Sequence, residues 1–271
     1  MSVAPLIARP ASVGGDAIRT AVPALVAIGE LTRQSLKSGA REGQFVFAVG
    51  SPIVFFICFY VPLHSRFDRM GIDYAQNLVP LVVIQAAIFV SIISCEIAGR
   101  AAQSGVRGRL ASLPMARSAP LISRMINASI RVTISLASTC ALGAALGFRF
   151  HGSVWDLVGF VLLAVIFAVS LSLMADAAGS VADHPDSIAQ MLMIPELILV
   201  VVSTGLVPVQ SFPEWVHPFV RNNPVTIFVD AMRALAAGTD VDITSVVAWS
   251  VILIGLGLFA SVLANRREVS R

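Results

Sequence analysis

Residues 78–98 read LVPLVVIQAAIFVSIISCEIA, and Glu96 is the only charged residue in that stretch. A helix of about 20 residues rises roughly 30 Å, which is the thickness of the hydrocarbon layer of a bilayer. Five more apolar runs approach or exceed this length, at residues 44–63, 119–147, 154–178, 187–207 and 243–264. The sequence therefore predicts six transmembrane helices.

The composition favours one helical bundle in lipid. Apolar residues make up 56% of the 271 residues and charged residues 13%, whereas soluble domains carry about 25% charged residues. In hydrocarbon only helices and closed barrels satisfy every backbone hydrogen bond, and the runs lack the alternation of barrel strands. We expect an all-α polytopic membrane protein, with a flexible cytoplasmic tail at residues 1–22 and a single transmembrane domain at residues 23–271.

The basic residues are distributed unevenly between the two ends of the predicted bundle. If the N-terminus is cytoplasmic, six spans return the C-terminus to the same side. The inner segments then hold 12 of the 19 basic residues, against five in the outer segments. The positive-inside rule favours this orientation, with both termini cytoplasmic. The arginines are scattered without interleaved aromatic residues, so nothing indicates nucleic-acid binding.

Two segments on the inner side do not span. Residues 23–38 are short and amphipathic, which favours a helix lying at the inner interface, although an ordinary lead-in to the first span also fits. Its predicted apolar face holds Leu25, Ile28 and Leu36, and its polar face holds Glu30, Arg33, Gln34 and Lys37. The loop at residues 99–118 is basic and lacks acidic residues. It fits either a short helix beneath the membrane or a solvated loop that only sets topology.

Charged residues inside the predicted spans are candidates for a functional network. One helical face of the third span carries Arg124, Asn127, Arg131, Ser135 and Ser138. Arg124 lies near the inner boundary and can extend to the interface. Arg131 is deeper and needs a partner, for which Asp176, Glu196 and Glu96 are the candidates. Glu196 follows Pro195 within the fifth span, and it is either part of a structural ion pair or a functional carboxylate.

The segment at residues 208–238 is apolar in two pieces that are each too short to span. Residues 221–224 read RNNP and separate the pieces. This pattern favours a re-entrant helical hairpin in the outer leaflet, because irregular backbone at that depth is tolerated when protein covers it. A surface loop with two amphipathic helices is the alternative. Asp230 and Arg233 are three residues apart and can pair on one helical face.

Motifs for catalysis and metal binding do not occur in the sequence. There is no GxxxxGK[ST] phosphate loop, no HExxH zinc motif and no GxSxG nucleophile elbow. None of the four histidines has a partner at metal-ligand spacing. We therefore expect no catalytic residue, no metal site and no ATP site in this chain.

The region after the fifth span resembles type-2 ABC exporter permeases. That family has a proline–tryptophan turn, then Asn-Pro, then an arginine in the next helix, and the matching positions here are Pro213, Trp215, Asn223, Pro224 and Arg233. Within the family, residues 50–56, 146–152 and 212–236 resemble daunorubicin-resistance-type permeases, some of which are associated with the export of complex mycobacterial lipids. One departure is the stretch at residues 108–114, which lacks the acidic residue that many members carry there.

The resemblance implies a transport subunit that is driven by ATP hydrolysis in another protein. A separate ABC ATPase, a dimer of nucleotide-binding domains holding ATP and Mg²⁺, would drive export of a hydrophobic or amphipathic lipid or drug. The permease would lie in the bacterial cytoplasmic membrane among its lipids, paired with a second, related permease chain. The residues that would couple it to the ATPase are Arg107, Arg109, Leu110, Leu113, Pro114, Glu30 and Arg33.

Two other classes of function remain open at this point. An ion-coupled secondary carrier could use Glu196 and Asp176 within the membrane. Six spans without a visible internal repeat speak weakly against that class. An intramembrane enzyme is disfavoured because the nucleophile and metal motifs are missing.

Overall fold

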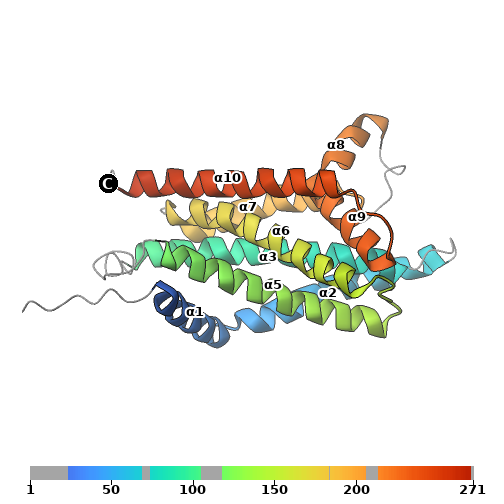
Figure 1. Ribbon diagram of the computed structural model, residues 1–271, viewed down its shortest axis with the longest axis horizontal. Helices are drawn as coiled ribbons and strands as arrows, with labels where there is room; N and C mark the ends of the chain where they lie inside the picture. The colour runs from blue at the N-terminus through green and yellow to red at the C-terminus, as the bar shows by residue number, and fades with distance from the viewer. Residues whose placement is uncertain (1–23, 69–73, 105–117, 183, 206–212, 270–271) are drawn as a thin grey trace, which may run out of the picture.

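A computed structural model describes residues 24–68, 74–104, 118–182, 184–205 and 213–269. Within these ranges the chain forms helices and no strands, as the sequence predicts. Five helices are long and apolar enough to cross a membrane, and they lie alongside one another (Figure 1). They are α2 (Gln44–Asp68), α3 (Tyr74–Gln103), α5 (Ala119–Ala145), α6 (Val154–Ser180) and α10 (Ile243–Val269).

Helix α3 forms the centre of the bundle. In its most apolar window 83% of the residues are buried, against 17–39% in the other four long helices. Close packing around α3 depends on glycine, since a Cβ on Gly179 of α6 would collide with the backbone of Cys95, and one on Gly99 would collide with Pro185. The apolar run at residues 78–98 therefore lies within α3, the helix around which the other helices pack.

The fifth predicted span differs from the other five. Helix α7 (Pro185–Val201) has 17 residues and ends before the predicted limit of residue 207. It carries Pro195 in its interior and is followed by a turn at residues 202–205. The sequence prediction overestimated the length of this helix because the apolar character of the chain continues through the turn.

The segment after α7 folds into short helices at one end of the bundle. A 3₁₀ turn, η2 (Glu214–Val216), and α8 (His217–Asn222) project from the bundle, and α9 (Pro224–Ala237) returns toward α3 and α6 (Figure 1). Phe228 of α9 packs against Phe167 of α6 with ring centroids 4.9 Å apart. Gly238 ends α9 with φ of 71°, a conformation that glycine adopts without steric cost.

Helix α1 (Ala24–Arg41) lies against α5 at the opposite end of the bundle, where α10 also ends (Figure 1). Ala27 and Thr32 are buried, whereas Leu25 is 83% exposed. The predicted apolar face is therefore only partly used for packing. The predicted tail at residues 1–22 lies outside the described residues.

Candidate functional site

The polar stripe predicted on the third span faces the interior of the bundle. Asn127, Arg131 and Ser135 are all buried. The Asn127 amide donates to Ser35 Oγ of α1 (2.7 Å), and Ser135 Oγ donates to the backbone carbonyl of Ala48 in α2 (2.6 Å). The stripe therefore attaches α1 and α2 to α5 through hydrogen bonds that are shielded from water.

Arg124 and Asp176 form a bidentate ion pair between α5 and α6. The distances are 2.5 Å from Nε to Oδ1 and 3.0 Å from Nη2 to Oδ2. The Arg124 side chain is 13% exposed and that of Asp176 only 4%. The carboxylate on the facing helix therefore holds the Arg124 guanidinium against the bundle, and the expectation that Arg124 extends to the membrane interface stays a prediction.

Arg131 is the deepest cation and has little compensation. It is 1% exposed, and its Nη2 donates to Ser94 Oγ of α3 (3.2 Å). Among the described residues, its Nε and Nη1 have no hydrogen-bond partner. Asp176, one predicted partner, is in contact with Arg124, and Glu96, another, pairs with Arg100 (2.9 Å).

Glu196 lies on the same side of α3 as Arg131. It is 9% exposed, and Oε1 accepts a hydrogen bond from Ser91 Oγ (2.9 Å). Its Oε2 has no partner among the described residues. Ser91 and Ser94 are three residues apart, so they share one face of α3. The two buried charges thus bind hydroxyls one turn apart, and no ion pair joins them in the described part of the chain.

Asn223 fastens α9 to the end of α7. Its Oδ1 accepts a hydrogen bond from the backbone N–H of Val225 (2.9 Å) and so caps α9. Its Nδ2 donates to the carbonyls of Leu199 (2.7 Å) and Val202 (2.6 Å). These carbonyls lie at the last turn of α7, where the helix supplies no partners of its own.

Arg233 joins three segments at the same end of the bundle. Its guanidinium donates to the carbonyls of Asn77 in α3 (3.0 Å), Thr204 (3.1 Å) and Gly205 (3.0 Å). It also pairs with Asp230 at 3.1 Å, the i, i+3 contact that the sequence predicts. Asn223 and Arg233 together satisfy the backbone carbonyls around the turn after α7.

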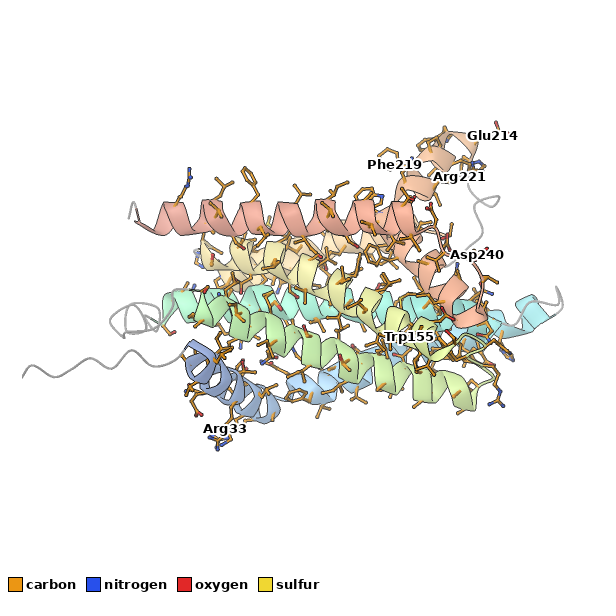
Figure 2. The ribbon with its side chains drawn as sticks, viewed as in Figure 1. Arg33, Trp155, Glu214, Phe219, Arg221 and Asp240 are labelled. Atoms are coloured by element: carbon orange, nitrogen blue, oxygen red, sulfur yellow. The ribbon has the colours of Figure 1, made fainter. Side chains whose placement is uncertain are left out.

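The other hairpin residues occupy turn and surface positions. Pro213 precedes η2, and Pro224 lies in the first turn of α9. Trp215 is 82% exposed. Figure 2 shows Glu214, Phe219 and Arg221 on the part of the chain that projects from the bundle. This projecting part presents two large apolar side chains, Trp215 and Phe219, away from the bundle.

The expected coupling residues fall in two places. Arg107, Arg109, Leu110, Leu113 and Pro114 lie outside the described residues. Glu30 and Arg33 are exposed on α1, where they form a weak pair at 3.5 Å. Figure 2 shows Arg33 directed away from the bundle.

Sequence reasoning missed the two serines of α3 that form hydrogen bonds with the buried Arg131 and Glu196. Ser91 and Ser94 interrupt an otherwise apolar run, and their three-residue spacing is the signal that could have found them. Among the described residues, no group of three His, Cys, Asp or Glu side chains could hold a metal ion.

The comparisons with known proteins define the family. The model of the family described as "ABC-2 type transporter" matches residues 27–236. The chain belongs to the ABC-2 type transporter family. This match covers α1, all of the polar stripe and nearly all of α9, so the residues described above lie within the family region.

Curated relatives of this ABC-2 chain are permease proteins. It is 37% identical over 229 residues to the doxorubicin resistance ABC transporter permease protein DrrB of Mycobacterium tuberculosis, covering 82% of this chain and 79% of the relative. It is 29% identical over 196 residues to the daunorubicin resistance ABC transporter permease protein DrrB1 of Streptomyces coeruleorubidus, covering 72% and 69%. It is 28% identical over 211 residues to the probable doxorubicin resistance permease protein DrrC of M. tuberculosis, covering 76% and 75%.

The family and the long apolar helices together establish the class of protein. The ABC-2 chain is an integral membrane protein and a transport component rather than an enzyme. ABC-2 permeases work with an ABC ATPase partner. Nothing in the comparisons supports the ion-coupled carrier that the sequence left open, and its two carboxylates have separate partners here, Arg124 and Ser91.

Proposed function

We propose that this chain is the membrane permease of an ATP-driven exporter that moves a hydrophobic or amphipathic compound, a complex lipid or a drug, outward from the cytoplasmic side. The observation that carries this proposal is the 37% identity to a doxorubicin resistance permease over 79% of that protein's length. The other relatives are also drug-resistance permeases. A predominantly apolar bundle suits such a cargo, because hydrophobic compounds reach it through the lipid.

The chain crosses the bacterial cytoplasmic membrane six times, with both termini cytoplasmic. The path of α7 along α3 supports the sixth crossing. Pro185 packs on Gly99, Glu196 binds Ser91, and Gly205 packs on Leu81. The 18 residues from Leu81 to Gly99 rise roughly 27 Å along α3, close to the hydrocarbon thickness. Helix α7 and its turn therefore traverse nearly the full layer although α7 alone is short.

The two short helical segments take different positions in this arrangement. Helix α1 lies at the cytoplasmic interface, which its exposed Leu25 and its basic residues favour. The hairpin at residues 208–238 re-enters the outer leaflet. The contacts of Asn223 and Arg233 support that position, because they satisfy backbone carbonyls that lipid would leave unpaired.

The energy comes from a separate ABC ATPase dimer that binds ATP and Mg²⁺ and docks on the cytoplasmic end. The basic segment with Arg107, Arg109, Leu110, Leu113 and Pro114, together with Glu30 and Arg33 of α1, forms the docking surface. A second, related permease chain completes the pathway across the membrane. The chain itself has no phosphate loop, so it must receive the work of ATP hydrolysis through this contact.

Reconstitution tests the proposal. The chain is purified together with the ATPase and permease encoded beside it, placed in liposomes, and assayed for ATP-dependent movement of doxorubicin and of fluorescent lipids. We expect transport that disappears when the phosphate-loop lysine of the ATPase is replaced. Equal transport by the lone chain without ATPase would overturn the proposal.

Coupling through the basic segment is tested separately. Replacing Leu110 and Leu113 by Asp should uncouple the complex, so that transport and substrate-stimulated ATP hydrolysis are both lost, because the apolar contact with the ATPase is removed. Unchanged transport and unchanged substrate-stimulated ATP hydrolysis would reject this role.

A further inference from the structure

Helices α1 and α5 enclose an open groove of about 460 Å³ at the end of the bundle where α10 ends. Its floor is apolar and includes Leu25, Ile28, Leu36 and Ile126. Leu25 is 83% exposed and Ile126 is 37% exposed, so the described chain leaves most of Leu25 and about a third of Ile126 uncovered. The volume falls within the range of about 300–1,000 Å³ that is usual for small-molecule sites.

The rim of the groove is cationic. Arg33 and Lys37 line it, whereas Glu30, the only acidic residue of α1, does not. The two cations are one turn apart, so their side chains are neighbours and repel one another unless an anion lies between them. The Arg33–Glu30 contact is long, at 3.5 Å, and exposed to solvent, so it relieves little of this repulsion.

We propose that this groove binds one anionic phospholipid of the inner leaflet, with an acyl chain on the apolar floor and the phosphate between Arg33 and Lys37. Basic amphipathic helices at a membrane surface attract anionic lipids through this combination of buried apolar area and charge. The lipid is a resident ligand that fixes α1 against α5 and not a transported molecule. The proposal rests on the placement of α1 at the cytoplasmic interface proposed above and does not depend on transport.

Native mass spectrometry of the full, delipidated chain in detergent tests the site. The chain is titrated with phosphatidylglycerol or with phosphatidylcholine of the same acyl chains. We expect the first phosphatidylglycerol to bind at least tenfold more tightly than phosphatidylcholine. The double variant Arg33→Gln/Lys37→Gln should weaken phosphatidylglycerol binding about 25-fold, roughly fivefold for each cation, and leave phosphatidylcholine unchanged. Arg41→Gln removes a charge from the same helix outside the groove and is the control.

The apolar floor has its own variant. Gly29 lines the groove and a Cβ on it meets no neighbouring atom, so Gly29→Leu should direct its side chain into the groove and weaken the binding of both lipids tenfold or more. Gly50 of α2 is equally open, so Gly50→Leu is the matched control and should bind as wild type.

Three outcomes would overturn the proposal. The first is equal affinity for the two lipids, and the second is wild-type binding by both groove variants. The third is release of the lipid on ATP turnover by the assembled exporter, which would make it a cargo. Loss of ATPase co-purification by Arg33→Gln/Lys37→Gln with unchanged lipid binding would assign these cations to the ATPase instead.

Discussion

At the scale of single residues, the buried charges of this permease fall into two groups. Arg124 and Asp176 neutralise each other through two hydrogen bonds. Arg131 donates to one serine hydroxyl and Glu196 accepts from another, and both keep polar atoms that have no partner among the described residues. Burying a charge without full compensation is costly, and in membrane proteins such residues generally serve function. The first group is therefore expected to determine stability and the second to determine transport.

Removing one member of the Arg124–Asp176 pair should destabilise the protein strongly. We expect Asp176→Asn to cost about 3–5 kcal/mol, because it leaves the Arg124 cation buried without its counter-charge. Adding Arg124→Gln should recover most of this loss. Thermal unfolding of the single and double variants in detergent measures the coupling. Strictly additive losses would show that the two residues act independently.

Arg131→Met should separate stability from transport. Only one hydrogen bond, of 3.2 Å, supports this cation, so an apolar side chain of similar size should change the unfolding free energy by less than about 1 kcal/mol or raise it. ATP-driven transport should fall at least tenfold, and Arg131→Lys should retain part of it. A stability loss above about 3 kcal/mol would instead identify Arg131 as a structural ion-pair residue.

The sequence predicted the polar stripe of α5 but not its partners. Helical periodicity places Arg124 and Arg131 on one face of their own helix. It does not reveal which turn of α3 or α6 lies opposite, and the two arginines are only two turns apart. From the sequence alone, Asp176 could therefore pair with either arginine. The close glycine packing of α3 and α6 fixes the position of α6 along the bundle, and Asp176 then lies beside Arg124.

At the scale of elements, α9 depends on the side chain that precedes it. Asn223→Ala removes a helix cap and leaves the Leu199 and Val202 carbonyls without their donor. We expect a loss of about 2–4 kcal/mol by thermal unfolding. Asn223→Asp keeps the helix cap but loses both Nδ2 donors. Its unfolding free energy should therefore lie between those of the wild type and Asn223→Ala, or below both.

The neighbouring Asn222→Ala is the control for this prediction. Asn222 is exposed and, among the described residues, its side chain bonds within α8 to the Pro218 carbonyl, so the change should stay within about 0.5 kcal/mol. Equal effects at positions 222 and 223 would contradict the attachment of α9 to α7.

The start of α10 has a modest pH-dependent cap. Asp242 accepts hydrogen bonds from the hydroxyl and N–H of Ser245, and the hydroxyl contact above all lowers the pKa of Asp242. A lowered folded-state pKa means that the stabilisation is complete above the ordinary aspartate pKa and is lost as the pH falls through the folded value. The protection factor for hydrogen exchange at the first turn of α10, which corrects for the intrinsic effect of pH on exchange, should therefore fall in acid, and Asp242→Asn should remove that dependence.

The starts of four of the five long helices were predictable, whereas the ends of α2, α3 and α10 lie five residues beyond their predicted limits and α7 ends early. The span expected at residues 154–178 begins at Val154, where Ser153 and Asp156 form a capping box, and ends at Ser180. The expected span at residues 187–207 became Pro185–Val201. Hydropathy cannot locate that end, because the turn is stabilised by Asn223 and Arg233, which lie more than 20 residues further along the chain.

At the scale of the whole molecule, the proposed six crossings would place the two ends of the bundle in different compartments. After replacement of Cys58, Cys95 and Cys140, Asp240→Cys should react with a membrane-impermeant maleimide on intact cells. Arg266→Cys should react only after permeabilisation. Both positions are exposed, so failure to label would not reflect burial. Labelling of both from outside would contradict the crossing by α10 and the cytoplasmic position of the C-terminus.

The central position of α3 has a consequence for biogenesis. Membrane helices enter the bilayer individually before they pack, and α3 emerges from the ribosome before α5, α6 and α7. Ser91 and Ser94 meanwhile bond to carbonyls of their own helix, those of Ile88 (2.7 Å) and Val90 (2.9 Å). The newly inserted helix can therefore remain in lipid with its hydroxyls bonded to its own carbonyls. The later segments then bring Arg131 and Glu196 to the same two hydroxyls.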